Sequence, residues 1–370
     1  MTSNGGVAEW LNAPVSKTGM SERASGVRIL PPPHMKKILL VTDAWPPLTN
    51  GVVFVQKPLI ASLKKRGYEV IVIEPSQFMT IPMPMYPEIR LALFSKHRIA
   101  KVIKDTNPDA IHIMTEGPLG WAARSVCMRE NVPFTTWYHT HFQLYVKAYL
   151  HGFLKPIHAM LRRFHSTAVR TIVSTESLKK SLESTGFKQN IAVVSFGVDA
   201  ELFSCNPSTS VTPLPKPVFV YFGRLGVEKS PEEFLKLKLP GTKLVLGGGP
   251  LLPELKKKYP EAHFFGRYTP GKEFIDQLSL VDVFVFPSRT ETFGLVVLEA
   301  LACGIPVAAH DVMGPRDIIT EGKDGYLSED LAEAAIKCLN LSRDDCRTKA
   351  LQYSWERCAD EFLKNLCFIR

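Results

Sequence analysis

Short runs of apolar residues alternate with longer amphipathic stretches along most of this chain, and Pro and Gly residues separate the two kinds of segment. The pattern is clearest in VFVFPSRTETFGLVVLEALACGIPVAA, residues 283 to 309. It predicts a buried strand at Val283 to Phe286, a helix at about Gly294 to Cys303 and a second buried strand at Pro306 to Ala309. Such a unit is typical of a parallel sheet, so we expect an α/β protein.

The alternation starts at Met35 and predicts a first domain over residues 35–205. The expected strands are Lys37 to Thr42, Glu69 to Glu74, Ala110 to Met114, Phe134 to Tyr138, Arg170 to Thr175 and Ile191 to Ser195. The expected helices are Val53 to Lys65, Ser95 to Asp105, Pro118 to Arg129 and a basic amphipathic helix over 155–170. This order predicts a doubly wound α/β domain.

A Pro-rich and Ser-rich linker is predicted at residues 206–217, before a second α/β domain over 218–352. Its expected strands are Val218 to Phe222, Lys243 to Leu246, His263 to Phe265, Val283 to Phe286 and Pro306 to Ala309. Residues 353–370 predict a C-terminal amphipathic helix. Residues 1–34 resemble peptides read from an upstream tRNA gene, so we expect translation to start at Met35; the alternative is a disordered arm.

Composition supports a two-domain globular protein, since the chain has 370 residues of which 45% are hydrophobic and 22% charged. No apolar run approaches the roughly 18 residues of a membrane span, and no secretory leader is visible. The seven cysteines contain no C-x-x-C pair. We therefore interpret them as reduced thiols of a cytoplasmic protein.

Charge is distributed unevenly between the two predicted domains. Residues 35–205 carry 21 Lys and Arg against 12 Asp and Glu, whereas residues 206–370 carry 21 against 22. The basic first domain could bind nucleic acid or the anionic inner face of a membrane. The predicted helix over 155–170 is a candidate membrane-surface helix, and the alternative is an ordinary solvated face.

The turn that leads into the predicted helix at Gly294 carries the most specific chemistry. The first helical N–H groups, near Phe293, Gly294 and Leu295, have no partner inside the helix and carry the positive end of its dipole, which suits a diphosphate. Glu291 and Glu299 flank this turn with seven residues between them, and carboxylates accept hydrogen bonds from sugar hydroxyls. Taken singly, each would be interpreted as a solvated glutamate.

The whole stretch from Glu291 to Ala308 resembles the signature of retaining glycosyltransferases of family 4, which have the GT-B fold. The resemblance implies two Rossmann-like domains that face a cleft, with a C-terminal helix that crosses back to the first domain. It implies that Glu299 binds the nucleotide ribose and Glu291 the transferred sugar, while amides at Phe293 to Leu295 hold the sugar and the distal phosphate. It implies no cofactor and no metal; the nucleotide-diphosphate sugar is a substrate.

Other strand ends carry further candidates. Arg224 and Lys229 follow the strand at Val218 to Phe222, where two cations could stabilise a diphosphate leaving group. The string Gly-Arg-Leu-x-x-Glu-Lys resembles the diphosphate motif of the family. Gly51 follows the first strand in an Asn-Gly turn and would let a phosphate approach the backbone. Asp43, at the end of that strand, is a weaker candidate for acceptor contacts.

His139, which follows the strand at Phe134 to Tyr138, is predicted to contact the sugar or the acceptor and to belong to the catalytic set with Glu291, Arg224 and Lys229. His141 is a less favoured alternative. Glu116 lies in Glu-Gly-Pro-Leu-Gly, which resembles a subgroup with GDP-mannose-dependent α-mannosyltransferases, and it is a second weak acceptor candidate. Gly247-Gly-Gly-Pro and Ser195-Phe-Gly-Val-Asp depart from the Gly-Asp-Gly-Pro and Arg-Gly-Val-Asp of relatives.

These features predict a retaining, metal-independent hexosyltransferase that uses a sugar nucleotide, with mannose favoured and a lipid or glycan precursor as acceptor. A UDP-sugar-dependent glucosyltransferase and a GT-B-like epimerase remain alternatives. A catalytically silent relative that binds nucleic acid or a membrane is the alternative outside enzymes, although we expect no nucleic-acid partner. The expected location is cytoplasmic, with a candidate peripheral site on the inner face of the membrane.

Overall fold

The fold is taken from a computed structural model, which describes residues 35–48, 50–83, 86–139, 154–187, 190–205, 211–266 and 271–369. The leader over 1–34, the alternative histidine His141 and residues 206–210 of the predicted linker lie outside the described residues. Within the described ranges, no helix combines the length and apolar character needed to cross a bilayer.

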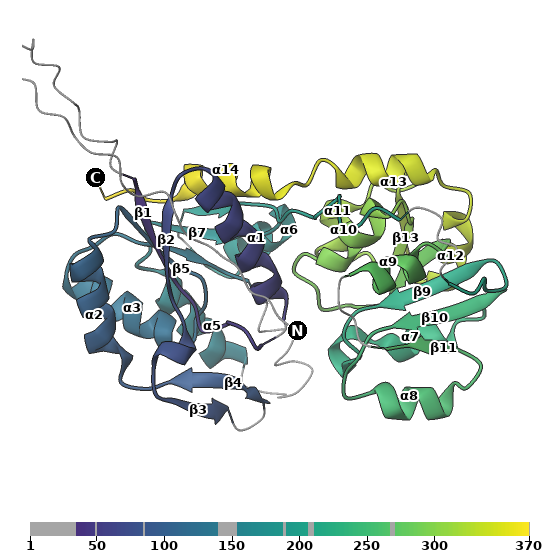
Figure 1. Cartoon of the computed structure of the whole chain (residues 1–370), viewed down its shortest axis with the longest axis horizontal. Helices are drawn as coiled ribbons and strands as arrows, with labels where there is room; N and C mark the ends of the chain where they lie inside the picture. Colours follow the sequence, from purple (N-terminus) through teal and green to yellow (C-terminus); the bar gives the residue numbers. More distant parts are fainter. Residues whose placement is uncertain are drawn as a thin grey trace, which may run out of the picture. The chain divides into compact units, whose positions relative to one another are not determined.

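The first predicted domain forms a six-stranded sheet in which every neighbouring pair is parallel, in the order β2-β1-β5-β6-β7-β8 (Figure 1). The strands are β1 (Lys37–Val41), β2 (Glu69–Ile73), β5 (Ala110–Ile113), β6 (Thr135–Trp137), β7 (Arg170–Val173) and β8 (Ile191–Val193). The helices are α1 (Gly51–Lys65), α2 (Ser95–Thr106), α3 (Pro118–Arg129), α5 (Leu154–His165) and α6 (Glu176–Ser184). The expected strands are present, each ending one or two residues earlier than predicted.

An antiparallel hairpin, which the apolar pattern did not predict, follows a 3₁₀ turn at Pro75–Gln77. It pairs β3 (Thr80–Met83) with β4 (Tyr86–Ala92), with Ile81 opposite Leu91. Prolines interrupt the sequence Ile-Pro-Met-Pro-Met-Tyr-Pro over residues 81–87, and a proline within a run argues against a strand. The two strands form their own small sheet, which accommodates this proline content.

The second sheet is also parallel throughout, in the order β11-β10-β9-β12-β13-β14. Its strands are β9 (Val218–Phe222), β10 (Thr242–Leu246), β11 (His263–Phe265), β12 (Val283–Phe286), β13 (Val307–Ala309) and β14 (Gly325–Leu327). Its helices are α7 (Pro231–Lys236), α8 (Leu252–Lys258), α9 (Lys272–Leu278), α10 (Leu295–Ala302), α11 (Pro315–Ile318), α12 (Leu331–Cys338) and α13 (Arg343–Ala350). Among these strands β14 was not predicted, because Gly325-Tyr326-Leu327 stands between the polar residues Asp324 and Ser328 and forms no continuous apolar run.

The C-terminal helix α14 (Trp355–Asn365) packs on the first sheet, as the GT-B resemblance implied. Its Phe362 is fully buried, edge-to-face with His112 at 4.8 Å and stacked on Trp137 at 5.6 Å. Arg66 at the end of α1 donates to Asp360 at 2.7 Å. The last residues of the chain therefore complete the core of the first sheet.

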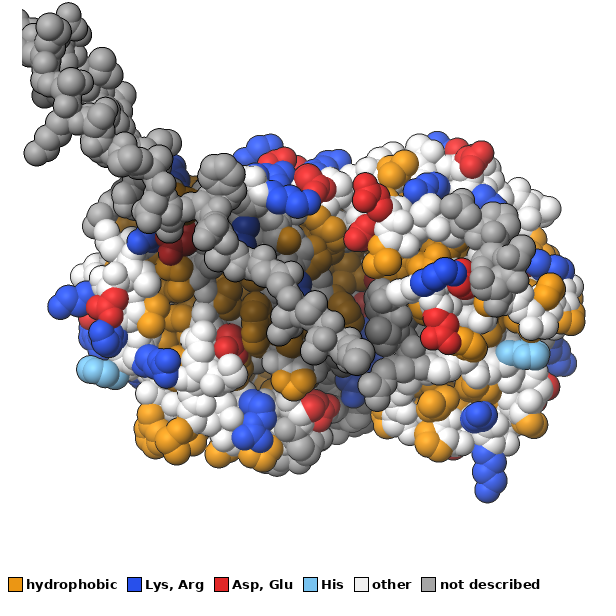
Figure 2. Space-filling view, in the orientation of Figure 1, with side chains coloured by type: hydrophobic (Ala, Val, Ile, Leu, Met, Phe, Trp, Pro, Cys, Tyr) orange, Lys and Arg blue, Asp and Glu red, His pale blue; other side chains and the backbone are white. Residues whose placement is uncertain are grey.

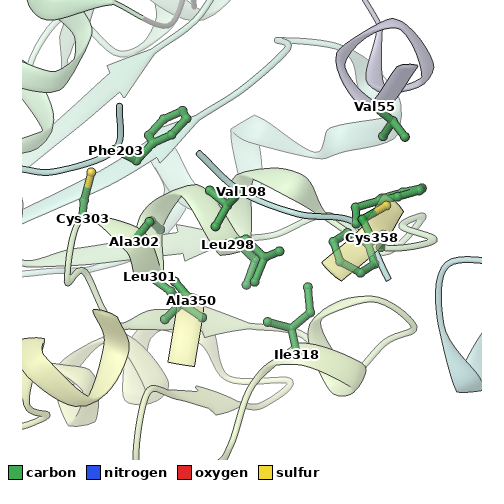
Figure 3. Close-up of a cluster of buried hydrophobic side chains, with 14 of the residues drawn as sticks. Val55, Val198, Phe203, Leu298, Leu301, Ala302, Cys303, Ile318, Ala350 and Cys358 are labelled. Atoms are coloured by element: carbon green, nitrogen blue, oxygen red, sulfur yellow. The ribbon is translucent and has the colours of Figure 1, made fainter. Parts of the chain in front are cut away.

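One continuous buried cluster draws side chains from α1, α10, α13 and α14, as Figure 3 shows for Val55, Leu301, Ala350 and Cys358. Arg347 of α13 reinforces it, since its guanidinium donates to the carbonyls of Phe203 at 3.2 Å and Ala200 at 3.1 Å. The segment that leaves the first sheet is thereby tied to the helices of the second. This packing fixes α10, which carries two of the predicted site residues.

The expectation that all seven cysteines are reduced is wrong for one pair. Cys205 and Cys303 form a disulfide, with their Cα atoms 4.7 Å apart and a sequence separation of 98. The fold brings the end of the first domain against the C-cap of α10, within the Cα separation that a disulfide requires. Spacing in the sequence carries no signal for so distant a pair, because only the tertiary fold brings the two residues together.

Candidate functional site

The strand order itself marks where a ligand should bind. In the second sheet β9 lies between β10 and β12, and the chain passes from β9 to one side of the sheet and later returns on the other. The crevice at the carboxyl ends of β9 and β12 is the topological switch point at which open α/β sheets bind ligands. The loop after β9 carries Arg224 and Lys229, and the loop after β12 carries Glu291.

Glycines let the loop after β9 fold closely onto the loop after β10. A Cβ added to Gly247 would lie 2.0 Å from the carbonyl oxygen of Gly223, which leaves no room for any side chain. Leu225 N donates to Gly248 O at 2.9 Å, and the buried Tyr221 hydroxyl donates to Arg224 O at 2.8 Å. The backbone at Arg224 is therefore fixed while its side chain is exposed to solvent.

Lys229 and Glu291 form an ion pair at the centre of the candidate site. Thr290 Oγ1 donates to Glu228 O at 2.8 Å, which holds the loop after β12 against the loop that carries Lys229. Burial lowers the pKa of Lys229 to about 8; the charge of Glu228 opposes this shift and that of Arg224 adds to it. At neutral pH Lys229 is therefore still cationic, and its ammonium group is paired with the Glu291 carboxylate.

The N-terminus of α10 lies directly after Glu291. Gly294 caps it with φ +87°, a left-handed conformation that glycine adopts without strain. Phe293 is buried edge-to-face against Phe196 at 4.8 Å, which fixes the backbone amides of this turn. Glu299 is half-buried and lies four residues after Leu295, on the same face of the helix. The predicted ribose-binding glutamate thus lies one helical turn from the predicted phosphate-binding amides.

His139 lies close to this loop, although it belongs to the first sheet. Thr292 Oγ1 donates to His139 O at 3.0 Å, while Ser174 and Thr175, after β7, each donate to Thr292 O at 3.3 Å. The structure therefore holds Thr292, the residue after Glu291, against strand ends of the first sheet. Ser174 and Thr175 escaped the sequence analysis because no motif distinguishes them.

The imidazole of His139 is buried and stacks on Trp137 at 4.9 Å. Burial lowers its pKa to about 3, so the ring is neutral at physiological pH. Its Nε2 atom has no hydrogen-bond partner in the part of the chain that the structure describes. A buried polar atom without a partner is uncommon and is one of the features of a ligand site.

The first sheet has its own switch point, between β1 and β5, where Asp43 and Glu116 follow the strands. Asp43 accepts hydrogen bonds from Leu119 N at 2.8 Å, Gly120 N at 3.2 Å and the Thr115 hydroxyl at 2.9 Å. Burial raises its pKa to about 6. The carboxylate thus anchors the first turn of α3, a structural task that the sequence did not reveal.

The Glu116 carboxylate accepts a hydrogen bond from the buried imidazole of His165, which in turn contacts Thr136. Its Oε1 lies 3.2 Å from His165 Nε2, and His165 Nδ1 lies 2.9 Å from Thr136 Oγ1. His165 was not a sequence candidate, since it lies 49 residues away at the end of α5. Gly51 is the first residue of α1, is exposed and has open space where a Cβ would stand, so a ligand could approach its backbone.

A second polar network, also not predicted, occupies the ends of β12, β13 and β14. His310 directly follows β13 and contacts Glu233 at 2.8 Å, and Arg289 contacts Glu329 at 2.8 Å. The position of His310 immediately after an apolar strand is the one sequence signal that could have identified this network. Among the described residues no group of three His, Cys, Asp or Glu side chains is placed to hold a metal ion.

Taken together, the second sheet brings a helix N-terminus, two cations and two glutamates to its switch point, and groups of this kind suit an anionic, hydroxyl-bearing ligand. Comparison with family models supports the resemblance to the family 4 glycosyltransferases. Residues 49–202 match the model described as Glycosyltransferase Family 4, and residues 207–350 match that described as Glycosyl transferases group 1. The chain belongs to family 4 of the glycosyltransferases.

Two curated relatives illustrate the family. A sulfoquinovosyl transferase of Arabidopsis thaliana is 32% identical over 77% of this chain, which spans 62% of that relative's length. A GDP-mannose-dependent α-mannosyltransferase of Mycobacterium tuberculosis is 28% identical over 79% of this chain and 83% of its own. Among solved structures, sucrose-phosphate synthase from Thermosynechococcus elongatus superposes with a TM-score of 0.69, at 19% identity, over 89% of this chain and 98% of its own. The last comparison supports the GT-B fold.

Proposed function

We propose that the protein is a retaining glycosyltransferase that moves a hexose from a nucleotide-diphosphate sugar to a hydroxyl acceptor. The observation that carries the proposal is the ion pair of Lys229 with Glu291 beside the N-terminus of α10, the helix that carries Glu299 in its second turn. Cation, amide donors and two carboxylates are the groups that a sugar diphosphate needs.

The proposed donor complex assigns one role to each group. Arg224 and Lys229 hold the diphosphate together with amides at Phe293, Gly294 and Leu295, and Glu299 accepts from the ribose hydroxyls. Glu291 accepts from hydroxyls of the transferred sugar. Lys229 is paired with Glu291, so a donor diphosphate would meet a cation that the fold holds beside the loop after β12.

The proposed reaction takes place on one face of the sugar. The bond between C1 and the diphosphate oxygen breaks, and the acceptor oxygen forms its bond to C1 from the same side. The acceptor proton passes to the departing diphosphate oxygen, whose growing charge Arg224 and Lys229 stabilise. This sequence needs no metal ion, and Glu291 positions the sugar and does not bond to it.

The acceptor side is assigned to the first sheet. The neutral His139, whose Nε2 atom has no hydrogen-bond partner among the described residues, would contact a hydroxyl of the sugar or acceptor, and Glu116 would line the acceptor side. Gly51 would let the donor diphosphate approach the backbone at the start of α1. Asp43 would act through its hold on the loop that carries Glu116. GDP-mannose is the favoured donor, which the 28% identical mycobacterial relative supports; a UDP-sugar is the alternative.

A lipid or glycan precursor is the proposed acceptor, on the cytoplasmic face of the membrane. The basic helix α5 offers Arg162 and Arg163 on its exposed side, and an anionic surface attracts such residues by about 1 kcal/mol each. This helix is one candidate for a peripheral contact with the bilayer.

The test is to incubate the protein with GDP-mannose or UDP-glucose and a panel of hydroxyl acceptors, and to follow release of the nucleoside diphosphate. NMR of the product should show the anomeric configuration of the donor, and activity should persist in EDTA. Glu291→Gln should lose nearly all turnover. Inverted product, or turnover of the variant near that of the wild type, would refute the proposal; interconversion of sugar nucleotides without diphosphate release would indicate an epimerase.

A further inference from the structure

Glu116 has an almost buried carboxylate at the end of β5. Its side chain is only 6% exposed, and a carboxylate so far from water needs a partner that donates a hydrogen bond. Among the described residues the hydrogen-bond partner of this side chain is His165, whose Nε2 atom lies 3.2 Å from Glu116 Oε1. His165 is fully buried, whereas the histidines visible on the face drawn in Figure 2 are at the surface, at the left and right edges of the view. The two groups therefore depend on each other and not on water.

The contact determines which nitrogen of the His165 ring carries a proton. An ionised carboxylate can only accept a hydrogen bond, so Nε2 must donate. On the other side of the ring, Nδ1 lies 2.9 Å from Thr136 Oγ1, which in turn lies 3.1 Å from Thr171 Oγ1. In one consistent direction, the Thr171 hydroxyl donates to Thr136, whose own hydroxyl donates to Nδ1. Every donor in this chain has an acceptor, which favours a single orientation of the imidazole.

Helix α3 holds both partners in place. It begins two residues after Glu116, and its Arg124 reaches the end of α5, where His165 is the last residue. The Arg124 guanidinium donates to the carbonyls of Phe164 at 2.9 Å and Arg163 at 2.8 Å. These carbonyls are among those that a helix leaves without internal partners at its C-terminus. One helix thus fixes the spacing between the carboxylate and the imidazole.

We propose that His165 is a positioning residue for the acceptor. By donating to Oε1 it holds the Glu116 carboxylate in one orientation. The second carboxylate oxygen has no hydrogen-bond partner among the described residues, and it accepts a hydrogen bond from a hydroxyl of the acceptor. His165 acts through Glu116 and touches no reacting atom. This role rests on the proposed function, which places Glu116 on the acceptor side.

Two substitutions separate the contact with Glu116 from the rest of the His165 side chain. His165→Gln places an amide N–H where Nε2 stood, whereas the shorter His165→Asn reaches only as far as Nδ1. The assay uses GDP-mannose or UDP-glucose as donor and methyl α-mannoside as the acceptor probe. His165→Asn should raise the acceptor KM about tenfold, which corresponds to one lost hydrogen bond to a charged group. His165→Gln should restore most of this loss, and the donor KM should stay unchanged in both variants.

A double-mutant cycle shows whether the effect passes through Glu116. In a Glu116→Gln background, His165→Asn should add no further rise in acceptor KM, because the carboxylate that it positions is gone. The matched control is His112→Asn. His112 is equally buried and its Nδ1 lies 2.7 Å from Thr135 Oγ1, but its Nε2 has no hydrogen-bond partner in the described part of the chain. This control should leave the acceptor KM unchanged; an equal rise there, or additive effects of the two site variants, would overturn the proposal.

NMR of isotope-labelled histidine tests the contact without turnover. The His165 signal, identified by its loss in His165→Gln, should show a proton on Nε2 and should shift when methyl α-mannoside is added to the protein with GDP. A neutral ring protonated only at Nδ1 would overturn the proposal, as would a signal that the sugar leaves unmoved.

The two proposals are read out separately. A protein whose His165 signal responds to the sugar, but which releases no nucleoside diphosphate from any donor, would keep the positioning role and refute the glycosyltransferase proposal. A protein that transfers sugar with the same acceptor KM in the wild type and in His165→Asn would do the reverse.

Discussion

Replacing Lys229 by Met should weaken nucleotide binding by an amount that the structure allows to be worked out. The side chain is 22% exposed and its partner Glu291 12%, so the cation acts in a region largely shielded from water. A hydrogen bond between a charged donor and an anion contributes about 1.5–3 kcal/mol net. Lys229→Met should therefore lower the affinity for GDP or UDP between about 10-fold and 150-fold.

The pH dependence gives this prediction a second, independent readout. Because burial lowers the pKa of Lys229 to about 8, the ligand-free protein loses the cation as the pH rises through that value. Nucleoside diphosphate affinity in the wild type should therefore fall above pH 8. Lys229→Arg keeps a charge that does not titrate in this range, so its affinity should stay level there. Isothermal titration calorimetry between pH 6.5 and roughly 9.5 measures both effects.

The variant Glu291→Gln separates the effect of Glu291 on diphosphate binding at Lys229 from its effect on turnover. Glu291 forms an ion pair with Lys229, so removing the charge of Glu291 should leave nucleoside diphosphate affinity equal or tighter while turnover is lost. If Lys229→Met binds nucleoside diphosphates within twofold of the wild type, or if Glu291→Gln binds them much more weakly, the assignment of this ion pair to the diphosphate site is wrong.

Three further predictions concern the frame of the site. Phe362→Ala should destabilise the protein by about 3–5 kcal/mol in urea unfolding, since its ring is fully buried on Trp137; a loss below roughly 1 kcal/mol would contradict the packing of α14. Because the pKa of Asp43 is raised in the folded protein, protonation of Asp43 favours the folded state. This contribution, about 3 kcal/mol, is complete below the ordinary pKa of an aspartate and is lost as the pH rises through about 6. Asp43→Asn should flatten that part of the stability profile; an unchanged slope would refute the argument. Cys205→Ser should remove the cross-linked peptide seen in non-reducing mass spectrometry and lower stability by about 2–4 kcal/mol under oxidising conditions, with no effect in dithiothreitol.

Most of the two sheets could be predicted from sequence for a physical reason. Strands of a parallel sheet are buried on both faces, so they form continuous apolar runs such as Val218–Phe222 and Val283–Phe286, which Gly and Pro then bound. The hairpin β3–β4 escaped because prolines interrupt its apolar pattern. The strand β14 was missed because it begins with a glycine and lies between Asp324 and Ser328, so its two apolar residues form no run.

The candidate site was predictable only as far as position along the chain allows. Residues that directly follow strands, such as Arg224 and His139, could be placed at the carboxyl edges of the sheets. The contacts among them could not: Lys229 meets Glu291 across 62 residues, and Glu116 meets His165 across 49. For Asp43 the position after a strand was misleading. It predicted a ligand contact, whereas the partners of the carboxylate include the backbone amides at the start of α3.

The most direct test of the central claim is a thermal-shift panel with GDP, UDP, ADP and their sugar conjugates, on the wild type and on Glu299→Ala. A ligand that binds only the folded state at 100 times its dissociation constant raises stability by about 2.7 kcal/mol. We predict a clear rise in melting temperature with one nucleotide and its sugar conjugate, lost in Glu299→Ala. No rise with any of these ligands, or an equal rise in the variant, would contradict the assignment of this strand-end crevice to a sugar nucleotide.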